Sequence, residues 1–160
     1  MNILGIDPGL GTTGYGVIMS ANNEVKLIDY GTIKTSTKDT LAQRLKIIFD
    51  NISNLIDIHK PSVFSIEEIF YSNNVKSSLL LGHARGVAIA AAATNDIIVY
   101  EYSAKKIKQS LTGNGNAHKE QVKFMVKNLL KLQEAPKSND ASDALAIAIC
   151  YILQNKLGAL

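Results

Sequence analysis

Four carboxylates in this chain stand where an acid is costly for stability, because each adjoins an apolar run. Asp7 follows Asn-Ile-Leu-Gly-Ile, Glu67 follows Ser-Val-Phe-Ser-Ile, and Asp140 with Asp143 opens an apolar segment. A charged group that is removed from water needs a partner. Several such acids brought together form a site for hard divalent cations, which prefer carboxylate oxygens. The pattern indicates a metal-dependent enzyme.

Each of these acids also has an ordinary structural explanation. Asp7 opens an Asp-Pro-Gly sequence, which is typical of a turn. Asp140 and Asp143 share one helical face, and acids in a first turn stabilise the helix by about 0.3–1 kcal/mol each. That explanation does not account for acids at the start of a helix that must be buried. Glu67 precedes Glu68, so in a strand their side chains point to opposite faces of the sheet. This alternation does not decide which of the two faces the site.

The elements that must position these acids alternate between strand and helix. Apolar periodicity predicts strands over 2–7, 14–20, 24–34, 62–67 and 97–101, and helices over 40–59, 75–94, 103–111, 118–132 and 140–155. Three meandering strands followed by alternating strands and helices predict an α/β fold with a mixed five-stranded sheet flanked by helices. At 160 residues, 46% of them hydrophobic and 19% charged, we expect one domain over 1–160.

The glycine-rich segment after the first strand has two interpretations. Gly9-Leu-Gly11-Thr-Thr-Gly14 matches the dinucleotide-binding pattern GxGxxG. That pattern requires the glycines to open a helix whose N-terminus meets a pyrophosphate. Here the residues that follow alternate as in a strand, so we expect a tight hairpin beside Asp7.

Positive charge is concentrated in one segment. Residues 105–131 hold seven lysines and one acid, which gives +6 there against +3 for the whole chain. Lysines 119, 123, 127 and 131 recur every four residues, as one stripe on the predicted helix. A stripe of one sign favours contact with nucleic-acid phosphates, and the alternative is a plain solvated face. The basic residues that we expect to contact DNA are Lys76, Lys105, Lys108, Lys119 and Lys123.

Two aromatic residues follow the Glu67 strand. Phe70 and Tyr71 are either core residues or exposed rings able to stack on unpaired bases, which contributes about 1–3 kcal/mol per base. A stripe of small residues, Gly82, Gly86 and Ala90, lies on the next predicted helix. Such a stripe allows another helix to approach closely, either inside the core or across a dimer interface.

The remaining features concern the compartment. The first residues show no signal peptide, and the longest apolar stretch, 86–93, is too short to cross a membrane. Cys150 is the single cysteine, so no internal disulfide can form. We expect a cytoplasmic protein with no membrane partner.

Four segments taken together resemble the RuvC family of Holliday-junction resolvases, which have the ribonuclease H-like fold. They are Gly5–Gly9 with Thr13–Val17, then Ile66–Phe70, Gly82–Ala88 and Asp140–Ala148, and the resemblance covers nearly the whole chain. The departures are a chain that stops at Leu160 without the basic tail of some relatives, and His83 where a more neutral polar residue is expected.

The resemblance implies roles for particular residues. The family's catalytic, metal-binding acids correspond to Asp7, Glu67, Asp140 and Asp143, so it selects Glu67 over Glu68. The aromatic residue that contacts the junction corresponds to Phe70. The functional lysines correspond to Lys108 and Lys119. The family is homodimeric, and the helix over 82–93 is expected in the interface.

The activity implied is the resolution of four-way DNA junctions by paired symmetric nicks, in homologous recombination and repair. The resemblance implies two Mg²⁺ ions, with Mn²⁺ able to substitute, and products with a 5′ phosphate and a 3′ hydroxyl. A branch-migration helicase is the expected partner.

Two other classes of protein fit part of the pattern. ATPases and kinases of the actin and sugar-kinase type also have Gly-Ile-Asp followed by glycines and threonines, but this chain is too short for their two lobes. A junction-binding module without catalysis would share the lysines. The presence of all four acids argues against it.

Overall fold

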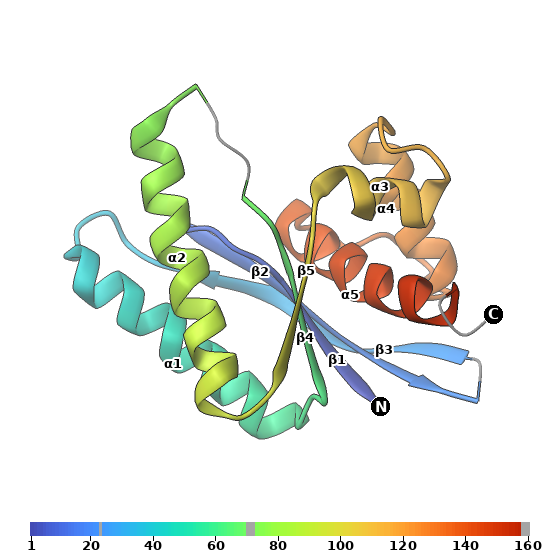
Figure 1. Cartoon of the computed structure of the whole chain (residues 1–160), viewed down its shortest axis with the longest axis horizontal. Coiled ribbons are helices and arrows are strands. Elements are labelled where there is room, and N and C mark those ends of the chain that lie inside the picture. The colour runs from blue at the N-terminus through green and yellow to red at the C-terminus, as the bar shows by residue number, and fades with distance from the viewer. Residues whose placement is uncertain (23, 70–72, 158–160) are drawn as a thin grey trace.

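The structure is a computed structural model that describes residues 1–22, 24–69 and 73–157, with side chains as far as Asn155 (Figure 1). The elements in chain order are β1 (Asn2–Asp7), β2 (Thr12–Ala21), β3 (Glu24–Lys34), α1 (Leu41–His59), β4 (Val63–Glu67), α2 (Val75–Thr94), β5 (Ile98–Tyr102), α3 (Ala104–Thr112), α4 (Lys119–Leu129) and α5 (Asn139–Leu157).

The strands form one mixed sheet in the order β3-β2-β1-β4-β5. β1, β2 and β3 pair antiparallel, whereas β4 pairs parallel to both β1 and β5. The predicted α/β class and the five-stranded mixed sheet are therefore confirmed. Parallel pairing needs a crossover connection, and α1 and α2 supply the two crossovers.

A helical layer covers each face of the sheet (Figure 1). On one face α1 and α2 pack on a core that includes Leu4, Ile6, Phe64 and Ile66. On the other face α5 packs on a core that includes Ile3 and Val63, and α3 and α4 cover α5 in turn. Alternate residues of one strand thus belong to different cores, as the two-residue period of a strand requires.

The glycine-rich segment forms the turn of the β1–β2 hairpin, with Asp7 opposite Gly14. The Thr13 hydroxyl donates to the carbonyl oxygen of Gly9 at 2.7 Å and accepts the Gly9 N–H at 3.3 Å. A strand and not a helix follows the glycines. The hairpin prediction is confirmed, and the dinucleotide-binding interpretation is excluded because it needs a helix N-terminus there.

The helix predicted over 118–132 is shorter than expected, and this part of the prediction is wrong. Lys131 adopts the left-handed conformation with φ 53°. Its N–H donates to the carbonyl oxygen of Asn128 at 3.1 Å, and the N–H of Leu132 donates to that of Lys127 at 2.9 Å. This is the pair of bonds of a Schellman motif, which ends a helix. The stripe of four lysines therefore loses its last member, Lys131.

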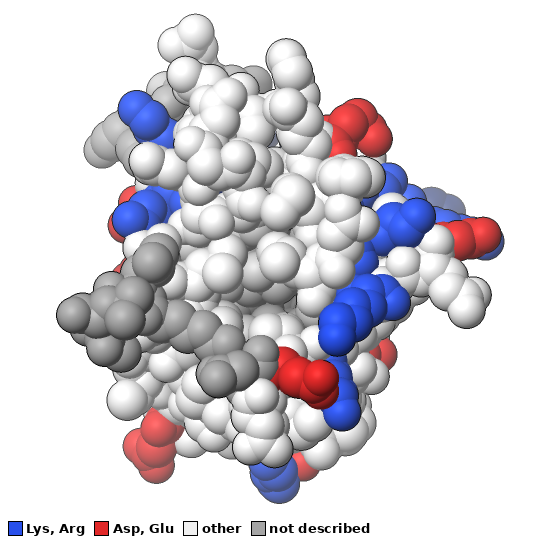
Figure 2. Space-filling view, turned by 90° about the vertical axis from the view of Figure 1, so that its right-hand side faces the viewer, with Lys and Arg blue, Asp and Glu red and all other residues white. Residues whose placement is uncertain are grey.

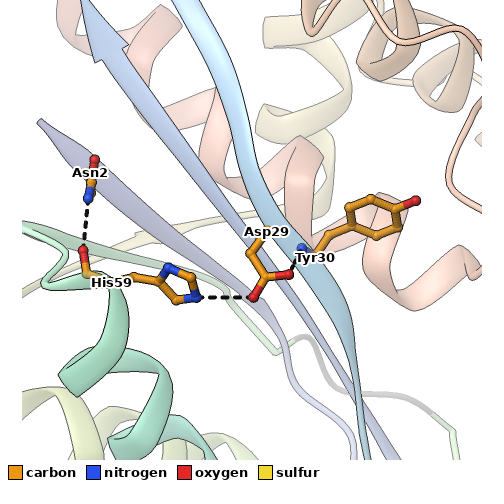
Figure 3. A network of polar contacts seen from close by, with 4 residues as sticks. All are labelled: Asn2, Asp29, Tyr30 and His59. Carbon is orange, nitrogen blue, oxygen red and sulfur yellow. Dashed lines mark hydrogen bonds and ion pairs between the residues drawn. The ribbon is translucent and has the colours of Figure 1, made fainter.

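A polar network attaches the end of α1 to the sheet (Figure 3). The ring Nε2 of His59 lies 3.0 Å from a carboxylate oxygen of Asp29 in β3, whose other oxygen accepts the N–H of Tyr30. The side-chain amide of Asn2 donates to the carbonyl oxygen of His59 at 2.8 Å. Asn2 is the first residue of β1 and Asp7 the last, so this network stabilises the opposite end of the sheet from the acids.

None of the helices in the described part of the chain is long and apolar enough to cross a membrane. Cys150 is buried, as its apolar neighbours suggest.

Candidate active site

Asp7 and Glu67 end two neighbouring parallel strands, β1 and β4, which pair through Ile6 and Ile66. The face toward which Glu67 points follows from Ser65, two residues earlier. The Ser65 hydroxyl donates to the carbonyl oxygen of Ile147 in α5 at 3.0 Å. Because residues two apart share a face, Glu67 also points to the α5 side. Asp7 shares that face with Ile3.

Glu68 points elsewhere. Its backbone N–H continues the sheet by donating to the carbonyl oxygen of Tyr102 at 2.9 Å, and its side chain is exposed. It lines a neighbouring hollow with Ile69 and Leu81, and Asp7 and Glu67 also line this hollow. The alternation pattern left Glu67 and Glu68 open, and of the two only Glu67 lines the pocket in which Asp7, Asp140 and Asp143 lie.

α5 lies directly on the sheet because glycines remove the side chains between them. A Cβ on Gly5 would stand 2.2 Å from the carbonyl oxygen of Ala144, and one on Gly16 would stand 2.6 Å from a methyl group of Leu145. Real Cβ atoms essentially never approach closer than 3.0 Å. This close packing brings the start of α5, with Asp140 in its first turn and Asp143 just after it, beside the ends of β1 and β4.

The four acids line one pocket of about 260 Å³ at this edge of the sheet. The other residues that line it come from α3, α4 and α5, and they are Ala104, Ile107, Lys108, Lys119, Val122, Ala146 and Ile147. The pocket thus has acidic and basic groups over an apolar floor. The structure therefore brings together the four acids that the sequence analysis selected.

Burial and the crowding of like charges raise the pKa values of Asp7, Glu67 and Asp143. Burial, followed by the charges of Asp143, Glu67 and Asp140, raises the pKa of Asp7 to about 8, and Lys119 opposes this change. Burial and then Asp143 raise the pKa of Glu67. Burial also raises the pKa of Asp143, although Lys119 works in the opposite direction. Acids that resist ionisation together need positive charge in the pocket.

Lys119 supplies part of that charge, since its Nζ lies 3.5 Å from a carboxylate oxygen of Asp143. It is the first residue of α4, where a cation is unfavourable because the helix N-terminus carries partial positive charge. Asp143 offsets this cost. Lys108 reaches the pocket from α3, and Lys123 donates to the side-chain oxygen of Asn139, at the start of α5, at 3.3 Å.

The donor set suits a hard divalent cation, because it consists of carboxylate oxygens. Among the described residues, however, no three His, Cys, Asp or Glu side chains lie closely enough to hold a metal ion as they stand. The acids share a pocket and repel one another, so an ion would have to draw their side chains together. The donor set therefore fits a hard divalent metal ion in its chemistry.

The other predicted DNA contacts are dispersed. Lys105 is exposed on α3, and Lys76 is exposed near the start of α2, away from the pocket lining. Phe70 and Tyr71 lie outside the described residues. The side of the molecule that carries α3 to α5 has its Lys and Arg side chains mainly along one edge (Figure 2).

One residue near the acids had no role in the sequence analysis. Arg85 in α2 donates from Nε to the backbone carbonyl oxygen of Glu67 at 2.9 Å, and its guanidinium forms an ion pair with Glu101 of β5. The Gly82–Ala88 segment that carries the family resemblance contains it. Nothing in the local sequence pattern assigns Arg85 to the end of β4, because the contact joins residues 18 positions apart.

The sheet order, its mixed pairing and the helical layers are those of the ribonuclease H-like fold, with acids at the edge of the sheet where two parallel strands end. Clustered carboxylates of this kind are the sites that metal-dependent phosphodiester hydrolases use. The family profile described as "Crossover junction endodeoxyribonuclease RuvC" matches residues 3–151. The chain belongs to this family.

Curated relatives agree with the family match. The RuvC of Alkaliphilus metalliredigens is 46% identical over 94% of this chain and 92% of its own length. The RuvC of Legionella pneumophila is 51% identical over 93% of this chain and 85% of its own length. The solved structure of Thermus thermophilus RuvC in complex with a Holliday junction substrate is 31% identical, with a TM-score of 0.94 over 99% of this chain and 96% of that one.

Proposed function

We propose that this chain, as one nuclease domain over residues 1–160, cuts four-way DNA junctions by paired symmetric nicks in homologous recombination and repair. The observation that carries the proposal is the pocket in which acids from β1, β4 and α5 meet two lysines. A relative supports the proposal: Thermus thermophilus RuvC, which was solved in complex with a Holliday junction substrate, shares this fold over 99% of the chain.

In this proposal Asp7, Glu67, Asp140 and Asp143 hold two Mg²⁺ ions, with Mn²⁺ able to substitute. When bound, the ions supply activation of the attacking water and charge stabilisation of the leaving 3′ oxygen, which yields a 5′ phosphate and a 3′ hydroxyl. The raised pKa of Asp7 supports this assignment, because a bound cation would stabilise the ionised carboxylate against the burial and the repulsion that raise its pKa.

The lysines of the pocket act on the substrate. Lys119 and Lys108 project into the space where a phosphodiester would approach the acids, so they neutralise its charge and orient it. Lys123, Lys105 and Lys76 extend the phosphate contacts beyond the pocket, which makes affinity fall with salt. Phe70 or Tyr71 stacks on a base unpaired at the crossover.

A homodimer would place two such sites on opposed strands of the junction, since a two-fold axis matches the approximate symmetry of a four-way junction. The face of α2 that is turned away from the core supports this arrangement. Val75 and Leu79 are 70% and 63% exposed, and a Cβ on Gly82 or Gly86 would meet nothing within 4 Å. The stripe of small residues is therefore not packed inside the core. A branch-migration helicase as partner and a cytoplasmic location are inferred from the family alone.

The deciding experiment incubates the purified protein with Mg²⁺ and either a mobile four-way junction or a linear duplex of the same sequence. Paired symmetric nicks in the junction alone would establish the activity. Tight junction binding without cuts, in Mn²⁺ as well, would favour a binding module. Equal cutting of both substrates would leave a metal nuclease and remove the junction specificity.

A further inference from the structure

Arg85 connects three elements beside the pocket. Its side chain leaves α2 and is 18% exposed. The Nε–H donates to the carbonyl oxygen of Glu67, the last residue of β4, at 2.9 Å. A terminal nitrogen of the same guanidinium pairs with the carboxylate of Glu101 in β5. One rigid planar group therefore ties the end of β4 to a helix and to the neighbouring strand.

The end of β4 needs such a contact. Glu67 must hold its carboxylate toward α5, but the chain leaves the regular strand directly after it. The N–H of Glu68, directly after the strand, donates to the carbonyl oxygen of Tyr102 at 2.9 Å. A hydrogen bond from a charged donor is stronger than one from a neutral donor. The guanidinium is well suited to restrain this backbone.

Glu101 holds the guanidinium in place from the opposite side. It lies on β5 directly beside Ile66 of β4, so it belongs to the same sheet as the group that it helps to position. An arginine with both ends of its fork engaged loses little further freedom when it binds a carbonyl. Glu101, which holds the guanidinium, and Glu67, whose carbonyl the guanidinium binds, thus lie on neighbouring strands of the same sheet.

We propose that Arg85 is a positioning residue: by fixing the backbone at Glu67 from α2, it sets the direction in which the Glu67 carboxylate enters the pocket. The inference rests on the proposed function, because the direction of Glu67 matters for cleavage only if this pocket is the active site. The contact of Arg85 is with the backbone carbonyl of Glu67, so in this proposal it acts through that carbonyl.

The test compares Arg85→Ala and Arg85→Lys with the wild type in single-turnover cleavage of a junction at saturating protein. We expect the Ala variant to cut about 10–100-fold more slowly, since misplacement of a reacting group by about 1 Å costs up to 100-fold. The Lys variant should recover part of the rate, because one ammonium can reach the carbonyl but cannot reproduce the fork. Junction affinity should stay within about 2-fold of the wild type, because no phosphate contact is removed.

Two further measurements separate positioning from a general loss of structure. The Mg²⁺ concentration for half-maximal cleavage should rise in Arg85→Ala, as one expected ligand is misdirected. Amide hydrogen exchange at Glu68 should become faster, while exchange in α5 stays as in the wild type. Lys46→Ala is the matched control, since Lys46 is a cation of α1 that pairs with Asp50 on the surface. It should change none of these readouts.

An Arg85→Ala protein that is folded and dimeric, cuts at the wild-type rate and shows unchanged exchange at Glu68 would overturn the inference. If that variant does not fold, Arg85→Lys decides, and a wild-type rate with a wild-type Mg²⁺ requirement would count against positioning. Failure of the proposed function looks different: the wild type itself would not cut junctions. The exchange at Glu68 would then still decide whether Arg85 holds the end of β4.

Discussion

Gly14 of β2 lies directly beneath Asp140 of α5. A Cβ on Gly14 would stand 2.0 Å from the carbonyl oxygen of Asp140. Gly14 also pairs with Asp7 across the β1–β2 hairpin. One glycine therefore sets the separation between the acid that ends β1 and the acids that begin α5.

Gly14→Ala should separate these acids. The new methyl group must push the start of α5 away from the sheet, because its obstacle is backbone and not a flexible side chain. We expect loss of stability of about 1–3 kcal/mol from overpacking, and cleavage reduced by at least about 100-fold. Gly11→Ala is the matched control, since the nearest atom to its Cβ is a side-chain nitrogen of Arg44 at 4.0 Å. Thermal melting and junction cleavage measure the two effects, and equal behaviour of both variants would contradict the argument.

Asp7→Asn should retain junction binding and lose cleavage. The amide keeps the shape of the side chain but removes a charged oxygen ligand, which should reduce the rate by at least about 100-fold, since even outer contacts of a metal ligand are worth 10–100-fold. Binding and single-turnover cleavage in Mg²⁺ are measured on the same junction. Normal cutting, with wild-type contamination excluded, would remove Asp7 from the proposed metal site.

The metal-free protein should become less stable as the pH rises. The pKa of Asp7 is about 8 in the folded chain and about 3.8 as an ordinary carboxyl, so between these values the folded state holds a proton that the unfolded state has lost. The free energy of unfolding therefore falls from about pH 4 to about pH 8 and levels off above that. The raised pKa values of Glu67 and Asp143 act in the same direction.

Melting of the wild type and of Asp7→Asn, in chelator, over this pH range measures the effect. At alkaline pH the Asn variant should melt at least about 3 °C higher, which corresponds to roughly 1 kcal/mol for a chain of this size. Added Mg²⁺ should reduce the difference by stabilising the ionised wild type. Melting temperatures that rise with pH in both proteins alike would show that Asp7 ionises freely.

Lys119→Ala should weaken binding and slow cleavage together. Loss of one phosphate contact makes the salt dependence of the binding constant shallower by about 0.9. The cleavage rate at saturating protein should fall too, because Lys119 lies 3.5 Å from Asp143 inside the pocket. Lys46→Ala, on the surface of α1, removes the same charge away from the pocket and should leave both quantities unchanged. An unaltered salt slope in Lys119→Ala would mean that this lysine does not contact DNA.

Leu79→Asp should produce a folded monomer. Leu79 is 63% exposed on α2, so the substitution should change the free energy of unfolding by no more than about 1 kcal/mol. A charge inside an apolar dimer interface, by contrast, is strongly unfavourable. Ile58→Asp on α1, where the side chain is 62% exposed, is the control that should remain dimeric. Sedimentation velocity distinguishes the species, and an intact Leu79→Asp dimer would place the interface elsewhere.

The order of helices and strands was predictable from the sequence, because it depends on the local spacing of apolar residues. The predicted strands and helices agree with the observed ones to within about two residues except at the end of α4. There the apolar pattern Leu129-Leu130-Lys131-Leu132 continues, and only the hydrogen bonds of the Schellman motif show where the helix stops. The acids were found because an acid beside an apolar run is locally unusual.

Contacts between distant parts of the chain could be read only from the tertiary structure. Residue alternation shows that Glu67 and Glu68 face opposite sides, but the position of α5, seen in the bond from Ser65 to Ile147, shows which side is the pocket. The glycines at 5, 14 and 16 are ordinary in a strand pattern until α5 is placed on them. Arg85 likewise has meaning only once α2 lies beside the end of β4. Local periodicity arises from neighbouring residues, whereas the choice of face and the separation of the acids arise from packing between elements far apart in sequence.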